Sequence, residues 1–75
     1  MKRTLRKLSQ QGDELIAEWE PTTVRRRRLE EIEREFNLLQ QKGYFAADIT
    51  DGRDLLIDKF DPDAEILMIP RVQGG

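Results

Sequence analysis

The chain has 75 residues with no cysteine and no histidine, and 13 basic against 15 acidic residues give a net charge of −2. This length suits one small domain, the two absences exclude disulfides, thiolate chemistry and histidine bases or ligands, and the acidic balance argues against general nucleic-acid binding. Since no apolar run reaches the roughly 20 residues of a membrane span and no signal-peptide segment follows the basic N-terminus, we expect a cytoplasmic protein that binds neither nucleic acid nor membrane.

An antiparallel hairpin is expected at the start of the chain. Residues 3–9 form a weakly patterned strand, because Leu5 and Leu8 do not alternate strictly. Residues 10–13 predict a turn in which Gly12 is available for positive φ. Residues 14–19 alternate more regularly and predict the second strand.

A helix is predicted over residues 23–42. Pro21 suits a helix entry, and Thr22 or Thr23 can cap free amide groups. Gly43 is expected to end the helix in a left-handed conformation. The spacing of three and four residues predicts one apolar face, with Val24 at its edge. The residues of this face are Leu29, Ile32, Phe36 and Leu39. On the exposed side, Glu30 and Arg34 are spaced for an i,i+4 ion pair.

The second half of the chain predicts two strands before the closing one. Residues 44–49 alternate as a strand, and residues 50–53 contain the reversal signal Asp-Gly. Another strand is expected from Leu55 to Phe60, followed by a turn over residues 61–63.

The closing strand, residues 65–70, and the segment after it are the most informative part of the sequence. Its four consecutive apolar residues predict a strand buried on both faces, and Pro70 marks the end of regular pairing. We therefore assign residues 1–70 to the domain and residues 71–75 to a flexible tail. The tail ends on Gly74 and Gly75, and a glycine pair is thin enough for a narrow enzyme channel. A frayed end is the alternative.

Residues 63–75 resemble the end of the ubiquitin-like β-grasp proteins, and most of all their prokaryotic branch. Sulfur carriers of that branch end in an acidic turn, an apolar strand and Pro-x-Val-x-Gly-Gly, which Pro70, Val72, Gly74 and Gly75 match. The predicted element order also agrees with this family, although the helix is long for it. The resemblance implies an α+β fold of the β-grasp (ubiquitin-like) class. Such a fold has one helix on one face of a mixed five-strand sheet, with the first and last strands adjacent in the middle.

The resemblance also implies a function. In the family, an ATP-using activating enzyme adenylates the terminal carboxylate, and the carrier supplies no catalytic side chain and no bound cofactor. Gly75 would therefore be the reactive residue of a protein that is not itself an enzyme and is monomeric when free. The tail residues that would enter the partner are Pro70, Arg71, Val72, Gln73 and Gly74. For a modifier, the implied partners also include a conjugating enzyme and an isopeptidase.

A run of four arginines begins the predicted helix: Arg25, Arg26, Arg27 and Arg28. Cations at this position oppose the helix dipole, which suggests contact with an acidic surface of a partner. The favoured alternative is a solvated face paired with nearby glutamates. The glutamates that would serve are Glu18, Glu20, Glu30, Glu31 and Glu33.

Other surface groups were considered as a docking face, as a metal site and as acceptor lysines. Ubiquitin-like proteins dock enzymes through a sheet face beside the tail, and the residues considered for it are Ile16, Ile49, Ile57, Met68 and Arg71. All of these except Arg71 fit a core better. Six aspartates lie in residues 48–63, but they lack the spacing of a calcium loop, so no metal site is expected. Lysines could accept further copies of a modifier in chain formation, but we interpret those of this sequence as ordinary solvated side chains. They are Lys2, Lys7, Lys42 and Lys59.

Three functions remain open after the sequence is considered. The first is a bacterial ubiquitin-like modifier conjugated through Gly75. The second is a sulfur carrier with a Gly75 thiocarboxylate, which feeds cofactor, nucleoside or amino-acid synthesis. The third is a β-grasp interaction module whose glycines are incidental. The Pro-x-Val-x-Gly-Gly ending favours a carrier, whereas the long arginine-started helix and the basic first strand favour a modifier, which we prefer. Genes for a conjugating enzyme and an isopeptidase nearby would indicate a modifier, and cofactor-synthesis genes a carrier.

Overall fold

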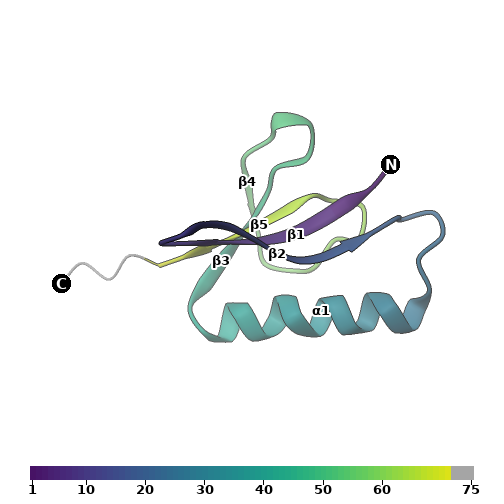
Figure 1. Cartoon of the computed structure of the whole chain (residues 1–75), viewed down its shortest axis with the longest axis horizontal. Coiled ribbons are helices and arrows are strands. Elements are labelled where there is room, and N and C mark those ends of the chain that lie inside the picture. Colours follow the sequence, from purple (N-terminus) through teal and green to yellow (C-terminus); the bar gives the residue numbers. More distant parts are fainter. Residues whose placement is uncertain (72–75) are drawn as a thin grey trace.

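A computed structural model describes residues 1–71 as one mixed sheet with an α-helix along one face (Figure 1). The elements are, in chain order, β1 (Arg3–Ser9), β2 (Gly12–Trp19), α1 (Arg26–Gln41), β3 (Tyr44–Asp48), the 3₁₀ turn η1 (Thr50–Gly52), β4 (Leu55–Ile57) and β5 (Ile66–Pro70). The sequence therefore predicted the type and order of the five strands and the α-helix correctly.

The closing strand β5 lies at the centre of the sheet, whose strand order is β2-β1-β5-β3-β4. β5 runs parallel to β1 and antiparallel to β3. The first and last strands are thus neighbours, and the arrangement is β-grasp-like, as the sequence predicted.

The hairpin of β1 and β2 explains why the first strand is weakly patterned. The register shifts between Leu5 and Arg6. Leu5 is buried in the core, whereas Leu8, three residues further along, is exposed. Because successive strand residues point to opposite faces, this odd spacing places one leucine on each face of the sheet. Gly12 pairs with Ser9 at positive φ (106°), which accommodates the tight connection.

The hydrophobic core lies between α1 and the sheet face that it covers. Ile32, Phe36 and Leu39 of α1 are buried, which confirms the predicted apolar face, and Leu29 and Val24 pack against its margin. The sheet contributes Leu5, Ala17, Trp19, Ala46, Ile66 and Met68. Gly43 follows α1 at φ 98°, the left-handed conformation expected of a residue that ends a helix.

The helix begins later than predicted, at Arg26 instead of residue 23. Residues 20–24 form a turn of their own, in which the Thr23 and Val24 N–H groups donate to the Glu20 carbonyl at 3.1 and 2.9 Å. Neither threonine caps α1, and its N-cap Arg25 makes no side-chain capping hydrogen bond. Neither helical segment of residues 1–71 combines the length and apolar character that a membrane crossing requires.

The fourth strand is shorter than predicted and stops at Ile57. The chain then turns Phe60 towards the core, where its ring centroid lies 5.6 Å from that of Trp19 and 5.8 Å from that of Phe36. Trp19 Nε1 also donates to the Pro62 carbonyl at 2.8 Å. Burial of an aromatic ring thus replaces strand pairing after Ile57.

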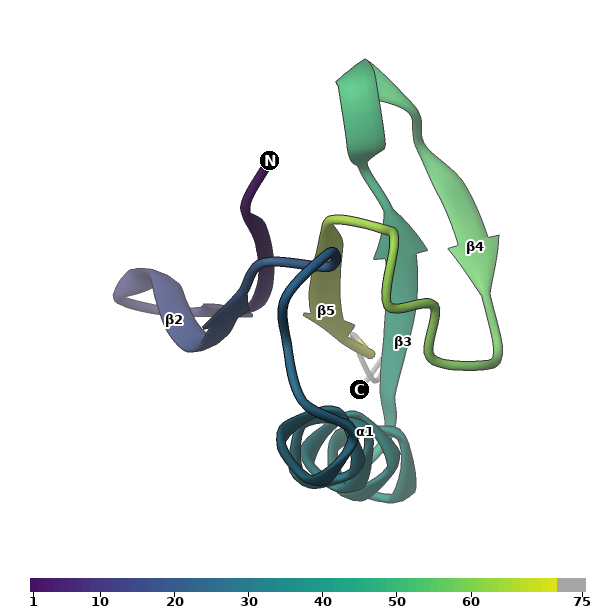
Figure 2. The same ribbon diagram turned by 90° about the vertical axis from the view of Figure 1, so that its right-hand side faces the viewer.

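The prediction that the closing strand is buried on both faces is wrong. Ile66 and Met68 are fully buried against the helix side, but Leu67 and Ile69 are half-buried. The reason is visible in Figure 2, where α1 lies against one face of the sheet and no element of residues 1–71 covers the other. We call this second surface the open face.

Candidate functional site

The segment that the sequence predicts to be reactive follows β5 directly, so the end of β5 is the part of the described structure nearest to it in the chain. Pro70 pairs with Tyr44 as the last residue of β5, and Arg71 after it is exposed. The pairing confirms that Pro70 ends the strand. The other predicted tail residues, Val72, Gln73, Gly74 and Gly75, lie outside the described residues.

Two open hollows flank this exit. One, of about 580 Å³, lies against the β1–β2 hairpin, and the other, of about 290 Å³, lies against the end of α1. Tyr44, Pro70 and Arg71 line both. A partner approaching Arg71 therefore has accessible surface on either side of the chain.

The open face carries a set of apolar side chains beside β5. Phe45 pairs with Ile69, and Ala47 lies between Leu67 and Leu56 in the register of β5, β3 and β4. These positions alternate with Ala46 and Met68 of the covered face. We define the open-face patch as Phe45, Leu56, Leu67 and Ile69, bordered on β1 and β2 by Leu8 and Leu15.

A cation lies within this apolar surface. Arg6 of β1 is half-buried and pairs with Leu67 on one side and Leu15 on the other. Among residues 1–71, the ion pairs do not include Arg6, whereas its neighbour Lys7 pairs with Glu14 at 3.4 Å. The open-face patch therefore suits a partner surface that is apolar and carries a carboxylate.

Most of the sheet-face residues considered from the sequence lie in or against the core, which is the place that the sequence favoured for them. Met68 is 0% exposed and points towards the helix, so it cannot contact a partner. Ile16 and Ile57 pack against the core, and only Arg71 is exposed. Sequence reasoning missed Phe45 and Ile69. Strand alternation finds Ile69 once a single face of β5 is taken as covered, because Ile69 then points away from buried Met68.

The arginine run lies far from the strand exit. All four arginines are exposed, and Figure 1 places the start of α1 and the end of β5 at opposite ends of the molecule. A helix of 16 residues spans about 24 Å. Arg28 approaches Glu31 at 3.9 Å, and Glu30–Arg34 is absent from the ion pairs of residues 1–71. The run and the exit therefore do not form one site.

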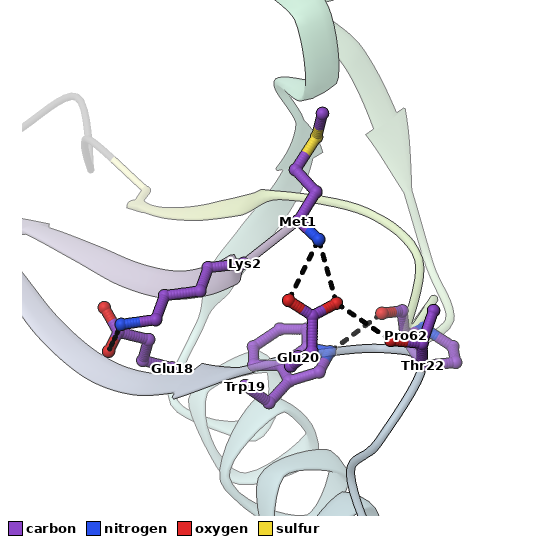
Figure 3. Close-up of polar contacts among 7 residues, drawn as sticks. All are labelled: Met1, Lys2, Glu18, Trp19, Glu20, Thr22 and Pro62. Carbon is purple, nitrogen blue, oxygen red and sulfur yellow. Dashed lines mark hydrogen bonds and ion pairs between the residues drawn. The ribbon is translucent and has the colours of Figure 1, made fainter.

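Glu18 of β2 and Glu20, the residue after β2, were considered as arginine partners, but each contacts the N-terminal residues Met1 or Lys2 (Figure 3). Both carboxylate oxygens of Glu20 accept hydrogen bonds from the Met1 ammonium at 2.9 Å, and Lys2 lies 3.3 Å from Glu18. The hydrogen bonds from the ammonium lower the pKa of Glu20, and one from Thr22 adds to this effect. Neither glutamate neutralises the arginine run.

Asp48 anchors the turn after β3. Its Oδ1 accepts hydrogen bonds from the Thr50 hydroxyl at 2.6 Å and the Thr50 N–H at 3.0 Å, and the Thr50 hydroxyl oxygen accepts one from the Glu65 N–H at 2.8 Å. These contacts join the η1 turn to the start of β5. Among residues 1–71, no three acidic side chains gather in a way that could hold a metal ion.

Asp48→Asn is expected to lower the free energy of unfolding at pH 7 by about 1 kcal/mol, because hydrogen bonds to a charged acceptor are stronger than those to a neutral one. The Thr50 hydroxyl and N–H, followed by the charges of Arg53 and Arg3, hold the pKa of Asp48 below its ordinary value of 3.8. This contribution is therefore complete above about pH 3.8 and is lost as the pH falls through the folded-state pKa. Urea titrations of both proteins between pH 7 and pH 2 measure the difference. A difference that stays constant down to pH 2 would contradict this role of the carboxylate.

No protein-family model matches the sequence, and searches of curated proteins and of solved structures find no match either.

Proposed function

We propose that this chain is a ubiquitin-like protein modifier, activated at the Gly75 carboxylate by an ATP-dependent enzyme and then conjugated to a target. The observation that carries the proposal is the place of β5. This central strand leads from the buried core through Pro70 and exposed Arg71 into a segment whose sequence ends on Gly74 and Gly75.

The chemistry suits a chain without histidine and cysteine. A carboxylate is a poor electrophile. Attack of its oxygen on the α-phosphorus of ATP releases pyrophosphate and forms an acyl adenylate. An amine or thiol then attacks the acyl carbon, and AMP leaves with the bonding electron pair. The activating enzyme supplies the groups that act in these steps, and this chain supplies an end without side chains.

The open-face patch supports the proposal as the surface on which the activating enzyme docks. Leu67 and Ile69 belong to β5 itself, so a partner held on the patch is placed beside the strand that continues into the tail. Interfaces of this kind centre on a few buried apolar or aromatic side chains, and Phe45 beside Ile69 offers such a centre.

Two mass measurements test the proposal. Intact mass of the protein purified from its own cells shows whether Gly75 ends the mature chain. Incubation with ATP and the cognate activating enzyme, followed by intact-mass analysis, then shows what is attached. Attachment to another protein supports the modifier, and an unchanged mass contradicts it.

A sulfur carrier is the second candidate, favoured by the match of Pro70, Val72, Gly74 and Gly75 to the ending of such carriers. The same incubation separates the two, because exchange of one carboxylate oxygen for sulfur identifies a carrier. An interaction module with incidental glycines predicts neither product.

Phe45→Asp is expected to lower kcat/KM for activation about 30-fold, which corresponds to about 2 kcal/mol, the typical effect of a residue at the centre of an interface. The new carboxylate would have to be buried in an apolar contact without a partner. Phe45 is 36% exposed in the free protein, so the fold should tolerate the change. Pyrophosphate release at varied concentrations of this protein measures the effect.

Leu38→Asp is the matched control, because Leu38 is 43% exposed but lies on the outer side of α1. This variant should be activated with the same kcat/KM as the unmodified chain. Equal losses in both variants would show that the patch is not the docking surface.

A further inference from the structure

A hollow of about 380 Å³ lies between the first half of α1 and the segment that joins β4 to β5. We call it the helix-start groove. Its lining is partly apolar and partly charged, and the residues are Leu29, Phe60 and Pro62 together with Arg26, Glu30 and Glu33. None of them belongs to the open-face patch, and the strand exit lies at the other end of the molecule (Figure 1).

The apolar wall of the helix-start groove is held in place by the core. The ring centroid of Phe60 lies 5.6 Å from that of Trp19 and 5.8 Å from that of Phe36. Trp19 Nε1 also fixes the Pro62 carbonyl at 2.8 Å. Leu29 and Phe60 are half-buried, so each keeps surface that a ligand can cover. Because the wall is already ordered, binding of an apolar side chain costs little additional ordering.

Positive charge is contiguous where the groove begins. Arg26 is the second of four consecutive exposed arginines, and the first turn of α1 contains neither an acidic side chain nor a side-chain capping hydrogen bond. Among residues 1–71, Arg28 approaches Glu31 at 3.9 Å, and the ion pairs include none of the other three arginines. A glutamate four residues after a cation is the less favourable order for a helical ion pair. Most of the run is therefore available to a ligand.

Negative charge borders the groove itself. Glu30 and Glu33 line it from α1, and Asp61 and Asp63 are the neighbours of Pro62 on the facing wall. The ion pairs of residues 1–71 include none of these four carboxylates. The region is thus not basic overall. Its charges are segregated into an uninterrupted arginine end and a groove bordered by carboxylates.

This segregation decides between possible occupants. A basic segment would meet the arginines. A nucleic acid carries negative charge along its whole length, so beyond the arginines it would meet the carboxylates of the groove. A segment whose carboxylates lie on one side of an apolar residue avoids both conflicts. Hydrogen bonds between arginine and carboxylate are charge-assisted and can be bidentate.

We propose that the helix-start groove binds an extended segment of a partner protein in which a cluster of carboxylates stands on one side of a large apolar residue. The apolar side chain packs between Leu29, Phe60 and Pro62, and the carboxylates bind the arginines of residues 25–28. Glu30 and Glu33 exclude further acidic residues from the other side. This site uses neither the glycine tail nor the open-face patch, so its test does not depend on the proposed function.

Four short peptides test this inference on the full chain. The first has three glutamates, one leucine and then serines, and we call it the acid–leucine peptide. The second has alanine for leucine, the third has lysines for the glutamates, and the fourth has glutamates on both sides of the leucine. The acid–leucine peptide should shift the backbone amides of residues 26–30 and 60–61 in NMR spectra, and added salt should weaken its binding. The second and fourth should bind about tenfold more weakly, and the third should not bind.

Arg26→Gln with Arg27→Gln is the decisive variant. Both side chains are exposed, so the fold should persist, which circular dichroism checks. This variant should bind the acid–leucine peptide about tenfold more weakly, which corresponds to about 1.4 kcal/mol. Arg34→Gln with Lys42→Gln is the matched control, because it removes two exposed cations at and after the other end of α1 and should leave the affinity unchanged.

Two further variants separate the parts of the site. Glu30→Gln with Glu33→Gln should raise the affinity for the peptide with glutamates on both sides, because it removes the repelling carboxylates. Deleting Gly75 should change none of these affinities.

Four results would overturn the inference. They are no binding of the acid–leucine peptide, equal binding of its alanine counterpart, equal losses in the arginine variant and its control, and NMR shifts confined to other parts of the chain. Tighter binding of a random DNA duplex than of the acid–leucine peptide would also overturn it and would assign the arginines to nucleic acid.

Discussion

Replacing Phe36 with alanine is expected to lower the free energy of unfolding by about 3–5 kcal/mol. Phe36, in the C-terminal half of α1, is 0% exposed, and its ring contacts Phe60, which in turn contacts Trp19. The substitution removes buried apolar area and leaves a cavity that the neighbouring rings fill incompletely. A domain of 75 residues has a total stability of about 4–11 kcal/mol. Urea denaturation followed by tryptophan fluorescence measures the loss, and the variant should be largely unfolded if the domain lies near the lower limit.

Leu38→Ala serves as the control within the same helix, because this side chain points away from the sheet and is 43% exposed. It should change the free energy of unfolding by no more than about 0.5 kcal/mol. A loss below about 1 kcal/mol for Phe36→Ala would mean that the apolar face of α1 does not form the core.

The order of elements could be predicted because local chemistry determines it. Gly43 ends α1 where a positive φ is needed, and the spacing of Ile32, Phe36 and Leu39 marks the helix face that meets the sheet. The helix start was misplaced, because Thr22 and Thr23 have the chemistry of caps but lie in a separate turn closed by the Glu20 carbonyl. Capping residues indicate that a helix is near, and backbone hydrogen bonds determine where it begins.

The candidate site was harder to predict than the fold. Four consecutive apolar residues in β5 fit a strand covered on both faces as well as one covered on a single face. The number of elements that pack on the sheet decides whether one face or both faces of β5 are buried. Among residues 1–71, α1 packs on one face and leaves the other uncovered. Because the strand was predicted to be buried on both faces, Leu67 and Ile69, which point away from Met68, were not recognised as surface residues. Phe45 was equally ambiguous until its pairing with Ile69 placed it on the open face.

Deleting Gly75 is expected to abolish activation and to leave the fold unchanged. Among residues 1–71, the buried side chains lie between Thr4 and Met68, and we expect the fold to persist without the last residue. The deletion moves the terminal carboxylate back by up to about 3.5 Å, and a displacement of about 1 Å can already cost roughly a hundredfold in rate. Pyrophosphate release and intact mass after incubation with the activating enzyme and ATP measure activation, and thermal unfolding measures the fold.

Two further variants separate the reach of the tail from its thickness. Gly74→Val keeps the carboxylate at its place in the sequence but adds a branched side chain, and it should block entry into a channel shaped for glycine. Deleting Gln73 keeps the glycine pair but shortens the tail by one residue. If the open-face patch and Pro70 hold the domain at a set distance from the catalytic groups of the activating enzyme, this deletion should also reduce activation. If the chain without Gly75 is activated as well as the full chain, the glycine end takes no part, and the modifier and the sulfur carrier fail together.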